Sequence, residues 1–240
     1  MKINENYLLD KKVKIFQPEG FYKASSDAVW ASSAIEKVKK GDKILDVGSG
    51  GGAISLCLAE RFKKKEISIT GIELQSVLAE SAKKSAEANG FNFLEFTNCN
   101  IFDCKISPCF FDHVVTNPPY AEEDMPSPNS SKAIAHNLQK NGLETWLKFC
   151  IKMLKPQGKF YIINRAEALE DILKVISGKL GKIEVFPLYS KVGQPAKRVI
   201  VRAQKDSKAP LIIHSGIVIH EADGTYSEKA NEVLRKGCAI

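Results

Sequence analysis

The stretch VVTNPPY, residues 114–120, places an amide, two prolines and an aromatic ring directly after an apolar run. The run predicts a buried strand that ends at Asn117. The side-chain carbonyl of Asn117 and the carbonyl of Pro118 can each accept one hydrogen of a planar amine, and the ring of Tyr120 can stack on a flat molecule. Prolines also fix φ and remove competing N–H donors. These residues predict a site that orients an exocyclic amine; ordinary turn chemistry is the alternative.

A glycine-rich stretch earlier in the chain has its own chemistry. LDVGSGGGAIS, residues 45–55, follows a short apolar run and opens a segment with helical spacing. Gly48, Gly50 and Ala53 fit G-x-G-x-x-G/A, and Glu73 ends the next predicted strand. Glycines let the backbone approach a ligand closely, and the acid can accept both hydroxyls of a ribose. The motif predicts a cofactor with a nucleoside part.

Asp46 stands two places before the first glycine and separates two kinds of cofactor. A carboxylate there would repel a pyrophosphate, but it suits a ligand that carries an ammonium group and a sulfonium charge. The sequence therefore favours S-adenosylmethionine over a dinucleotide. A purely structural glycine turn is disfavoured, because three consecutive glycines are costly to order.

The elements that must position these residues follow an alternating order. Apolar or alternating runs predict strands at 43–47, 67–74, 93–98, 112–117, 159–164, 183–188 and 198–204, and helical spacing predicts helices at 53–62, 76–90, 143–158 and 166–181. This order predicts an α/β, Rossmann-like fold with a seven-stranded, mostly parallel sheet and helices on both faces. In such a sheet the strands that lead to Gly48 and Asn117 flank one crevice. Residues 121–137 are predicted to form a long polar loop.

The net charge of +7 is unevenly distributed. Residues 1–144 carry 18 basic and 19 acidic residues, a net charge of −1, whereas residues 145–240 carry 17 and 9, a net charge of +8. The basic part predicts a polyanionic partner such as nucleic acid, or simply a solvated surface. Lys191, Lys197 and Arg198 belong to the basic segment 191–198, which connects the last two predicted strands, and Lys132 lies in the polar loop; all four are candidate phosphate contacts.

Compartment and redox state follow from what the chain lacks. It has no apolar run long enough to span a membrane and no apolar segment typical of a signal peptide, so we expect a cytoplasmic protein. The six cysteines form no C-x-x-C pair, and no histidine lies at ligand spacing. We therefore expect reduced thiols and no metal site.

In this context NPPY resembles the amino-methyltransferase motif of class I S-adenosylmethionine-dependent enzymes, and the resemblance covers residues 15–204. It implies direct in-line methyl transfer, without a metal, to an exocyclic amine of adenine or cytosine or to a glutamine amide. By this resemblance, Asn117, Pro118 and Tyr120 hold the amine. The implied cofactor-binding residues are Asp46, Gly48, Ser49, Gly50, Glu73, Leu74, Asn100, Ile101 and Asn117. The family usually has Asp where this chain has Asn100, which leaves the adenine contact open between Asn100 and Asp103.

The stretch FQPEGFYKASSDAVWASSA, residues 16–34, is similar to the corresponding part of bacterial adenine-N6 methyltransferases that modify a valine tRNA beside its anticodon. The matching residues are Gln17, Pro18, Ser26, Asp27 and Ala28. This resemblance implies a tRNA partner and three parts of the chain: a segment covering the cofactor pocket (1–42), a methyltransferase domain (43–208) and a C-terminal extension (209–240).

Three alternatives to tRNA methylation remain open at the level of the sequence. One is methylation of a release-factor glutamine, although those enzymes carry a larger helical domain before the first strand. Another is N-methylation of a base in rRNA. The third is an RNA-binding protein on the same fold without turnover, which an intact Asp46, Glu73 and NPPY disfavour. The sequence does not indicate the oligomeric state.

Overall fold

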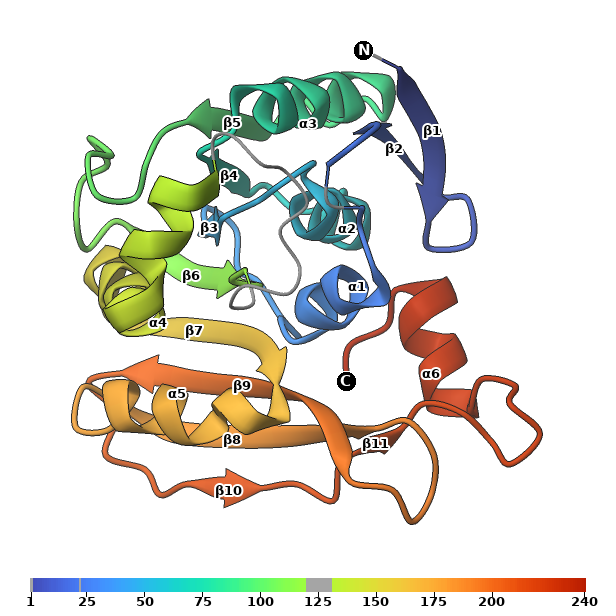
Figure 1. Cartoon of the computed structure of the whole chain (residues 1–240), viewed down its shortest axis with the longest axis vertical. Coiled ribbons are helices and arrows are strands. Elements are labelled where there is room, and N and C mark those ends of the chain that lie inside the picture. The colour runs from blue at the N-terminus through green and yellow to red at the C-terminus, as the bar shows by residue number, and fades with distance from the viewer. Residues whose placement is uncertain (1, 22, 120–130) are drawn as a thin grey trace.

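The computed structural model describes residues 2–21, 23–119 and 131–240, with only the backbone described for 131–141 (Figure 1). The main sheet has the order β10-β8-β9-β7-β6-β3-β4-β5, with β11 also paired to β8. Its strands are β3 (Lys43–Val47), β4 (Ser68–Glu73), β5 (Leu94–Asn98), β6 (Phe111–Thr116), β7 (Leu154–Arg165), β8 (Leu180–Tyr189), β9 (Ala196–Lys205), β10 (Ile212–Ile213) and β11 (Ile217–Val218).

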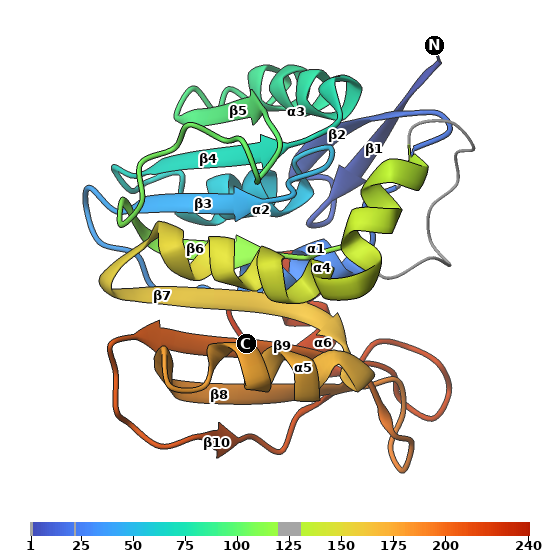
Figure 2. The same ribbon diagram turned by 60° about the vertical axis from the view of Figure 1, so that its left-hand side comes forward.

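Strands β5, β4, β3, β6 and β7 are parallel neighbours, and β9 is antiparallel to both β7 and β8. The carboxyl ends of the five parallel strands meet at one edge of the sheet, as the arrows in Figure 2 show. The strand order reverses between β3 and β6, where Val47 pairs with Thr116. The predicted fold class is confirmed, and within the described residues β10 and β11, near the end of the chain, extend the seven predicted strands of the main sheet to nine.

Helices cover both faces of the sheet because successive strand residues point to opposite sides. Ile44 and Val115 belong to one apolar core, and Leu45 and Val114 to the other. Helices α1 (Ser26–Ser33), α2 (Ala53–Phe62) and α3 (Ser76–Ala88) contribute to the first core, and α4 (Ser131–Met153) and α5 (Leu169–Ile176) to the second. Within the described part of the chain, no helix is long and apolar enough to cross a membrane.

The N-terminal segment forms a hairpin, β1 (Ile3–Leu8) and β2 (Val13–Pro18), that the sequence analysis missed. Side chains at every fourth position of α3 bind the free edge of β2. Ser85 Oγ accepts from Phe16 N at 2.9 Å, Ser81 Oγ donates to Phe16 O at 2.6 Å, and Asn89 bonds both backbone groups of Lys14. One face of a helix thus takes the place of a neighbouring strand for the hairpin.

The C-terminal residues extend the sheet and then return to α1. Strands β10 and β11 pair in parallel with β8, and α6 (Glu228–Asn231) continues into a π-helical turn at Glu232–Lys236. Ala230 and Val233 are fully buried in the core that contains α1. Ile240 N donates to Ser33 O at 3.3 Å. The division into segments 1–42, 43–208 and 209–240 stays a prediction.

Two of the predicted helices have wrong bounds. Helix α4 begins at Ser131, inside the predicted polar loop, and ends at Met153, before the predicted stop at Pro156 and Gly158. Leu154 already belongs to β7, because it is the ladder partner of Phe111 in β6, and its side chain is fully buried. The helix predicted for 166–181 is a 3₁₀ turn at Ala166–Ala168 followed by α5, which ends at Ile176.

Candidate functional site

Three strands bring the candidate cofactor and amine residues to the same edge of the sheet. Strand β3 leads into the glycine loop, residues 48–52; β4 ends at Glu73; and β6 leads into Asn117. These strands are direct neighbours in the order β4-β3-β6, so their carboxyl ends adjoin (Figure 2). The two strand ends that are predicted to flank the crevice, those of β3 and β6, are therefore adjacent.

The glycine loop is fixed by its backbone. Gly48 N and Ser49 N both donate to Ile72 O at 2.9 Å, and Gly50 N donates to Glu73 Oε2 at 2.9 Å. Gly50 has a φ of +54°, and a Cβ added there would meet no atom of the described residues within 4 Å. Its Cα therefore borders open space, which is what a ligand at close range needs.

Asp46 is the fully buried residue before this loop. Its Oδ2 accepts from Ser55 Oγ at 2.7 Å and from Ser55 N at 3.2 Å, which ties it to the first turn of α2. Among the described residues, its Oδ1 has no hydrogen-bond partner. Burial raises the pKa of Asp46 to about 7, the Ser55 hydrogen bonds oppose this, and the nearby Glu73 carboxylate adds to it. A cation beside Oδ1 would remove much of this penalty, which is roughly 4 kcal/mol for the charged form.

Glu73 is also buried, and both of its oxygens face backbone donors. Oε1 accepts from Gln75 N at 2.8 Å and Oε2 from Gly50 N. Burial raises the pKa of Glu73, and these backbone hydrogen bonds work in the opposite direction. The next residue, Leu74, is 38% exposed, so a carboxylate and an apolar side chain lie together at the end of β4.

The loop after β5 holds the two candidates for the adenine contact. Asn100 is half-buried, and its Oδ1 accepts from Phe102 N at 3.1 Å, whereas Asp103 is exposed. Ile101 is half-buried and packs against the second core. Cys99 and Cys104 form a disulfide across this loop, so the prediction of reduced thiols is wrong for these two. Their Cα atoms lie 5.5 Å apart because the loop turns back on itself, a proximity that spacing in the sequence does not show.

On the amine side, Asn117 is half-buried, Pro118 is buried and Pro119 is exposed. Tyr120 and the side chain of Lys132 lie outside the described residues. Two residues near Asn117, Thr116 and Trp146, were not predicted from the sequence. Trp146 Nε1 of α4 donates to Thr116 Oγ1 at 2.9 Å, and Thr116 Oγ1 donates to Val47 O at 2.8 Å. The sequence signal that could have revealed this contact is the threonine directly before NPPY, a hydroxyl side chain at the end of an otherwise apolar strand.

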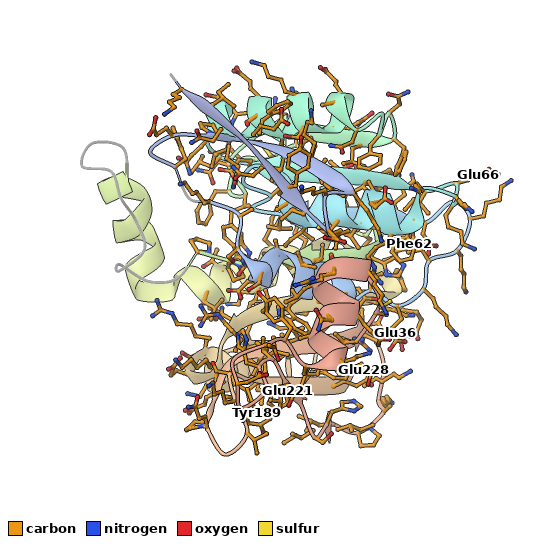
Figure 3. All side chains as sticks on the ribbon, turned by 90° about the vertical axis from the view of Figure 1, so that its right-hand side faces the viewer. Glu36, Phe62, Glu66, Tyr189, Glu221 and Glu228 are labelled. Atoms are coloured by element: carbon orange, nitrogen blue, oxygen red, sulfur yellow. A yellow bond between two sulfur atoms is a disulfide. The ribbon has the colours of Figure 1, made fainter. Side chains whose placement is uncertain are left out.

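The three basic candidates lie where β8 turns into β9, with Lys191 in the connection and Lys197 and Arg198 at the start of β9, and they differ in what surrounds them. The connection from β8 to β9 lies at the same edge of the sheet as the glycine loop. In Figure 3, Tyr189, where β8 ends, lies away from Glu66, which precedes β4 and marks the other edge. Lys197 is exposed, whereas Lys191 Nζ donates to Ala222 O at 3.2 Å. Arg198 Nε donates to Asp27 Oδ2 of α1 at 3.0 Å, a pairing that the sequence analysis missed.

The residues at this edge fit S-adenosylmethionine on the evidence of two orphaned buried atoms. Asp46 Oδ1 and Ser49 Oγ both lack a hydrogen-bond partner among the described residues. Asp46 stands two places before the glycine loop and Ser49 lies within it, next to Gly50 in the chain. Buried polar atoms are rarely left unpaired unless a ligand or water completes them. An acceptor and a hydroxyl beside a glycine loop match the ammonium and carboxylate of the methionine part.

A family model described as "Methyltransferase domain" matches residues 38–192, more than half of the chain. The chain belongs to this methyltransferase family. The match runs from the residues before β3 to the connection after β8, so it contains the glycine loop, Glu73 and Asn117. The prediction of an S-adenosylmethionine-dependent methyltransferase is thereby confirmed, and the individual site residues stay predictions.

The methyltransferase is similar to curated proteins named tRNA1(Val) (adenine(37)-N6)-methyltransferase. It is 29% identical to the protein from Shewanella baltica over 198 residues, which covers 80% of this chain and 82% of the relative. It is 26% identical to the protein from Dyadobacter fermentans over 232 residues, with 94% of both chains covered.

Solved structures agree on the fold of the methyltransferase. A predicted O-methyltransferase of Agrobacterium tumefaciens superposes with a TM-score of 0.73 at 22% identity, covering 89% of this chain and 98% of that one. A 16S rRNA N2 methyltransferase of Thermus thermophilus, solved with AdoMet and guanosine, has a TM-score of 0.61 at 16% identity, covering 85% and 50%. At these identities the likeness concerns the fold alone.

Proposed function

We propose that this methyltransferase transfers the methyl group of S-adenosylmethionine to an exocyclic amine, and that the amine is N6 of an adenine in tRNA. The observation that carries the proposal is the meeting of an acid-flanked glycine loop and Asn117-Pro118 at the carboxyl ends of neighbouring strands. The curated relatives named as tRNA adenine-N6 methyltransferases support the choice of amine. Their coverage of the chain supports the same assignment for the whole protein.

On the donor side, the residues would hold the cofactor by charge and by shape. When bound, S-adenosylmethionine supplies an electrophilic methyl group on a sulfonium. Asp46 Oδ1 would accept from its ammonium group, and Ser49 Oγ would bond the methionine end. Glu73 would accept from the ribose hydroxyls, while Leu74 and Ile101 would pack on the adenine. The half-buried Asn100 suits the adenine contact better than the exposed Asp103.

On the amine side, Asn117 and Pro118 would orient the nitrogen. Two carbonyl acceptors in the plane of an amine take its two hydrogens and direct its lone pair toward the methyl group. The attacking nitrogen is neutral, so no general base is required, and the proton can leave after transfer. Tyr120 would stack on the base, which must be turned out of its stack to reach the site.

The basic side chains would contact RNA beyond the reacting base. Lys197 is the exposed candidate at the edge that carries the site, and Lys191 and Lys132 would add to it. We assign Arg198 a smaller part, because its guanidinium already pairs with Asp27. Localisation in the cytoplasm, the compartment in which mature tRNA is found, stays a prediction.

Isotope labelling tests the proposal. The purified chain is incubated with S-[methyl-³H]adenosylmethionine and, separately, with unmodified tRNA, rRNA and release factors, and the labelled product is identified after digestion. N6-methyladenosine from tRNA is the expected product. Label in a protein glutamine or in an rRNA base would overturn the substrate and keep the reaction class. Cofactor binding without label in any pool would favour an RNA-binding role.

A further inference from the structure

One buried hydroxyl joins the two sides of the site. Thr116, the last residue of β6, is fully buried, and its Oγ1 donates to Val47 O at 2.8 Å. Val47 is the last residue of β3 and the ladder partner of Thr116. Beyond this pair the two strands end: β3 continues into Gly48 and β6 continues into Asn117. The hydroxyl therefore closes the ladder at the point where the crevice opens.

An indole from a third element completes the arrangement. Trp146 of α4 donates its Nε1 hydrogen to Thr116 Oγ1 at 2.9 Å and is only 9% exposed. Its ring also covers Gly48, where an added Cβ would lie 2.6 Å from Trp146 Cζ2. Glycine at this position is thus required by the indole as well as by a φ of +71°. Trp146 consequently contacts the donor side and the amine side at once.

We propose that Thr116 and Trp146 are positioning residues that hold the glycine loop and Asn117 in a single relative placement. The proposal rests on the proposed function, because in-line methyl transfer makes that placement decisive. A displacement of about 1 Å between reacting groups can reduce a rate by about 10²-fold. The glycine loop would hold the methyl donor, and Asn117 would hold the amine that accepts the methyl group. A hydroxyl that joins β3 to β6 therefore controls how donor and amine are aligned.

The other described anchors of the glycine loop do not make this connection. Gly48 N, Ser49 N and Gly50 N all bond to residues of β4, which lies on the far side of β3 from β6. They can hold the loop against the sheet without setting its distance from Asn117. Loss of the Thr116 hydroxyl should therefore affect alignment more than cofactor binding.

Tryptophan emission and kinetics together test the proposal. The chain has two tryptophans, Trp30 and Trp146, so a Trp30→Phe parent reports Trp146 alone. In this parent, Thr116→Val keeps the side-chain shape but removes both hydrogen bonds. We expect kcat to fall about 10- to 100-fold. The Kd for S-adenosylhomocysteine should change by less than about threefold, since the anchors on β4 remain. Thr116→Ser, which restores the hydroxyl, should recover most of the lost kcat.

A second variant guards against simple misfolding. Trp146→Phe keeps an aromatic ring over Gly48 but removes the donor, and it should lower kcat with the same preserved Kd. Because Thr116→Val already removes the hydrogen bond from Trp146, Trp146→Phe with Thr116→Val should cost little more than Thr116→Val alone. An unaltered kcat in Thr116→Val, or equal losses in Thr116→Val and Thr116→Ser, would overturn the proposal.

A binding readout separates this proposal from the proposed function. S-adenosylhomocysteine should shift the emission of Trp146 in the parent, and Thr116→Val should diminish that shift. This measurement needs no RNA. If the parent methylates none of the tested pools, the proposed function fails, while an emission shift that is identical in Thr116→Val overturns the positioning role independently.

Discussion

The donor side and the amine side of the site are held in different ways. On the donor side, the glycine loop bonds the backbone of Ile72 and the carboxylate of Glu73 in β4, and the buried carboxylate of Asp46 bonds Ser55 of α2. On the amine side, Asn117 is followed by two prolines that have no N–H to donate, and the residue before it, Thr116, is bonded to Val47 and to Trp146. We conclude that donor-side changes should alter cofactor affinity, whereas amine-side changes should alter the rate.

The largest effect should come from the amine side. Asn117→Ala removes an acceptor of the reacting amine, so we expect kcat to fall by about 10²- to 10³-fold. Single-turnover methylation of tRNA at saturating cofactor measures this. Asn117→Asp, which keeps acceptor oxygens, should retain more activity than Asn117→Ala. A rate close to that of the unaltered chain would remove Asn117 from the reaction.

A donor-side change should give the converse result. Asp46→Asn removes the charge that would pair with the ammonium group, so S-adenosylhomocysteine affinity should fall about 10- to 100-fold. The rate at saturating cofactor should stay close to that of the unaltered chain. Isothermal titration gives the affinity, with the exposed Asp171→Asn as the matched control. Unchanged affinity in Asp46→Asn would contradict the role of this carboxylate.

The same carboxylate predicts a pH dependence. The raised pKa of Asp46, about 7, means that the folded chain without cofactor favours the protonated form, and its stability falls as the pH rises through that value. A bound ammonium group favours the ionised form, so cofactor affinity should rise about tenfold between pH 6 and pH 8. Titrations at both pH values measure this. Asp46→Asn should flatten the profile, and an equal slope in that variant would assign the titration to another group.

A smaller effect is expected at the disulfide of the adenine loop. Reduction of Cys99–Cys104 frees the backbone around Asn100, so cofactor affinity should weaken about two- to fivefold through the cost of ordering the loop again. Titration with and without dithiothreitol measures this, and Cys109→Ser, an exposed free cysteine, serves as control. If the cofactor affinity is the same with the disulfide oxidised and reduced, the disulfide does not contribute to ordering the adenine loop.

The smallest effect should arise furthest from the reacting atoms. Lys197→Glu should weaken tRNA binding a few-fold and reduce the slope of affinity against salt by about 1. Arg198 is less suitable, because its replacement also breaks the pair with Asp27. Lys64→Glu is the control, since that exposed lysine follows α2 at the opposite edge. Equal effects of both changes would indicate net charge rather than a local contact.

The sequence predicted the parts of the site that depend on local pattern. Strand β3 and helix α2 have the predicted bounds, because an apolar run, a glycine loop and a helical period follow one another directly. The ends of β4 and β6 follow from similar signals. Parallel strands then bring Glu73 and Asn117 to the same edge without further information.

The features that the sequence did not predict depend on distant partners. Strand β2 is held by Ser81 and Ser85, which belong to a helix far along the chain. Arg198 finds Asp27 across 171 positions, and Trp146 finds Thr116 across 30. Periodicity does not report such pairings, since it indicates which face of an element is buried but not which distant side chain lies against it.

The affinity of Asn117→Ala for S-adenosylhomocysteine tests the division between donor and amine sides most directly. Isothermal titration of this variant beside the unaltered chain requires no RNA and no turnover. We predict dissociation constants within about twofold of each other, because the donor side keeps all of its anchors. A loss as large as that of Asp46→Asn would show that Asn117 holds the cofactor itself, and the two sides would then be a single binding unit.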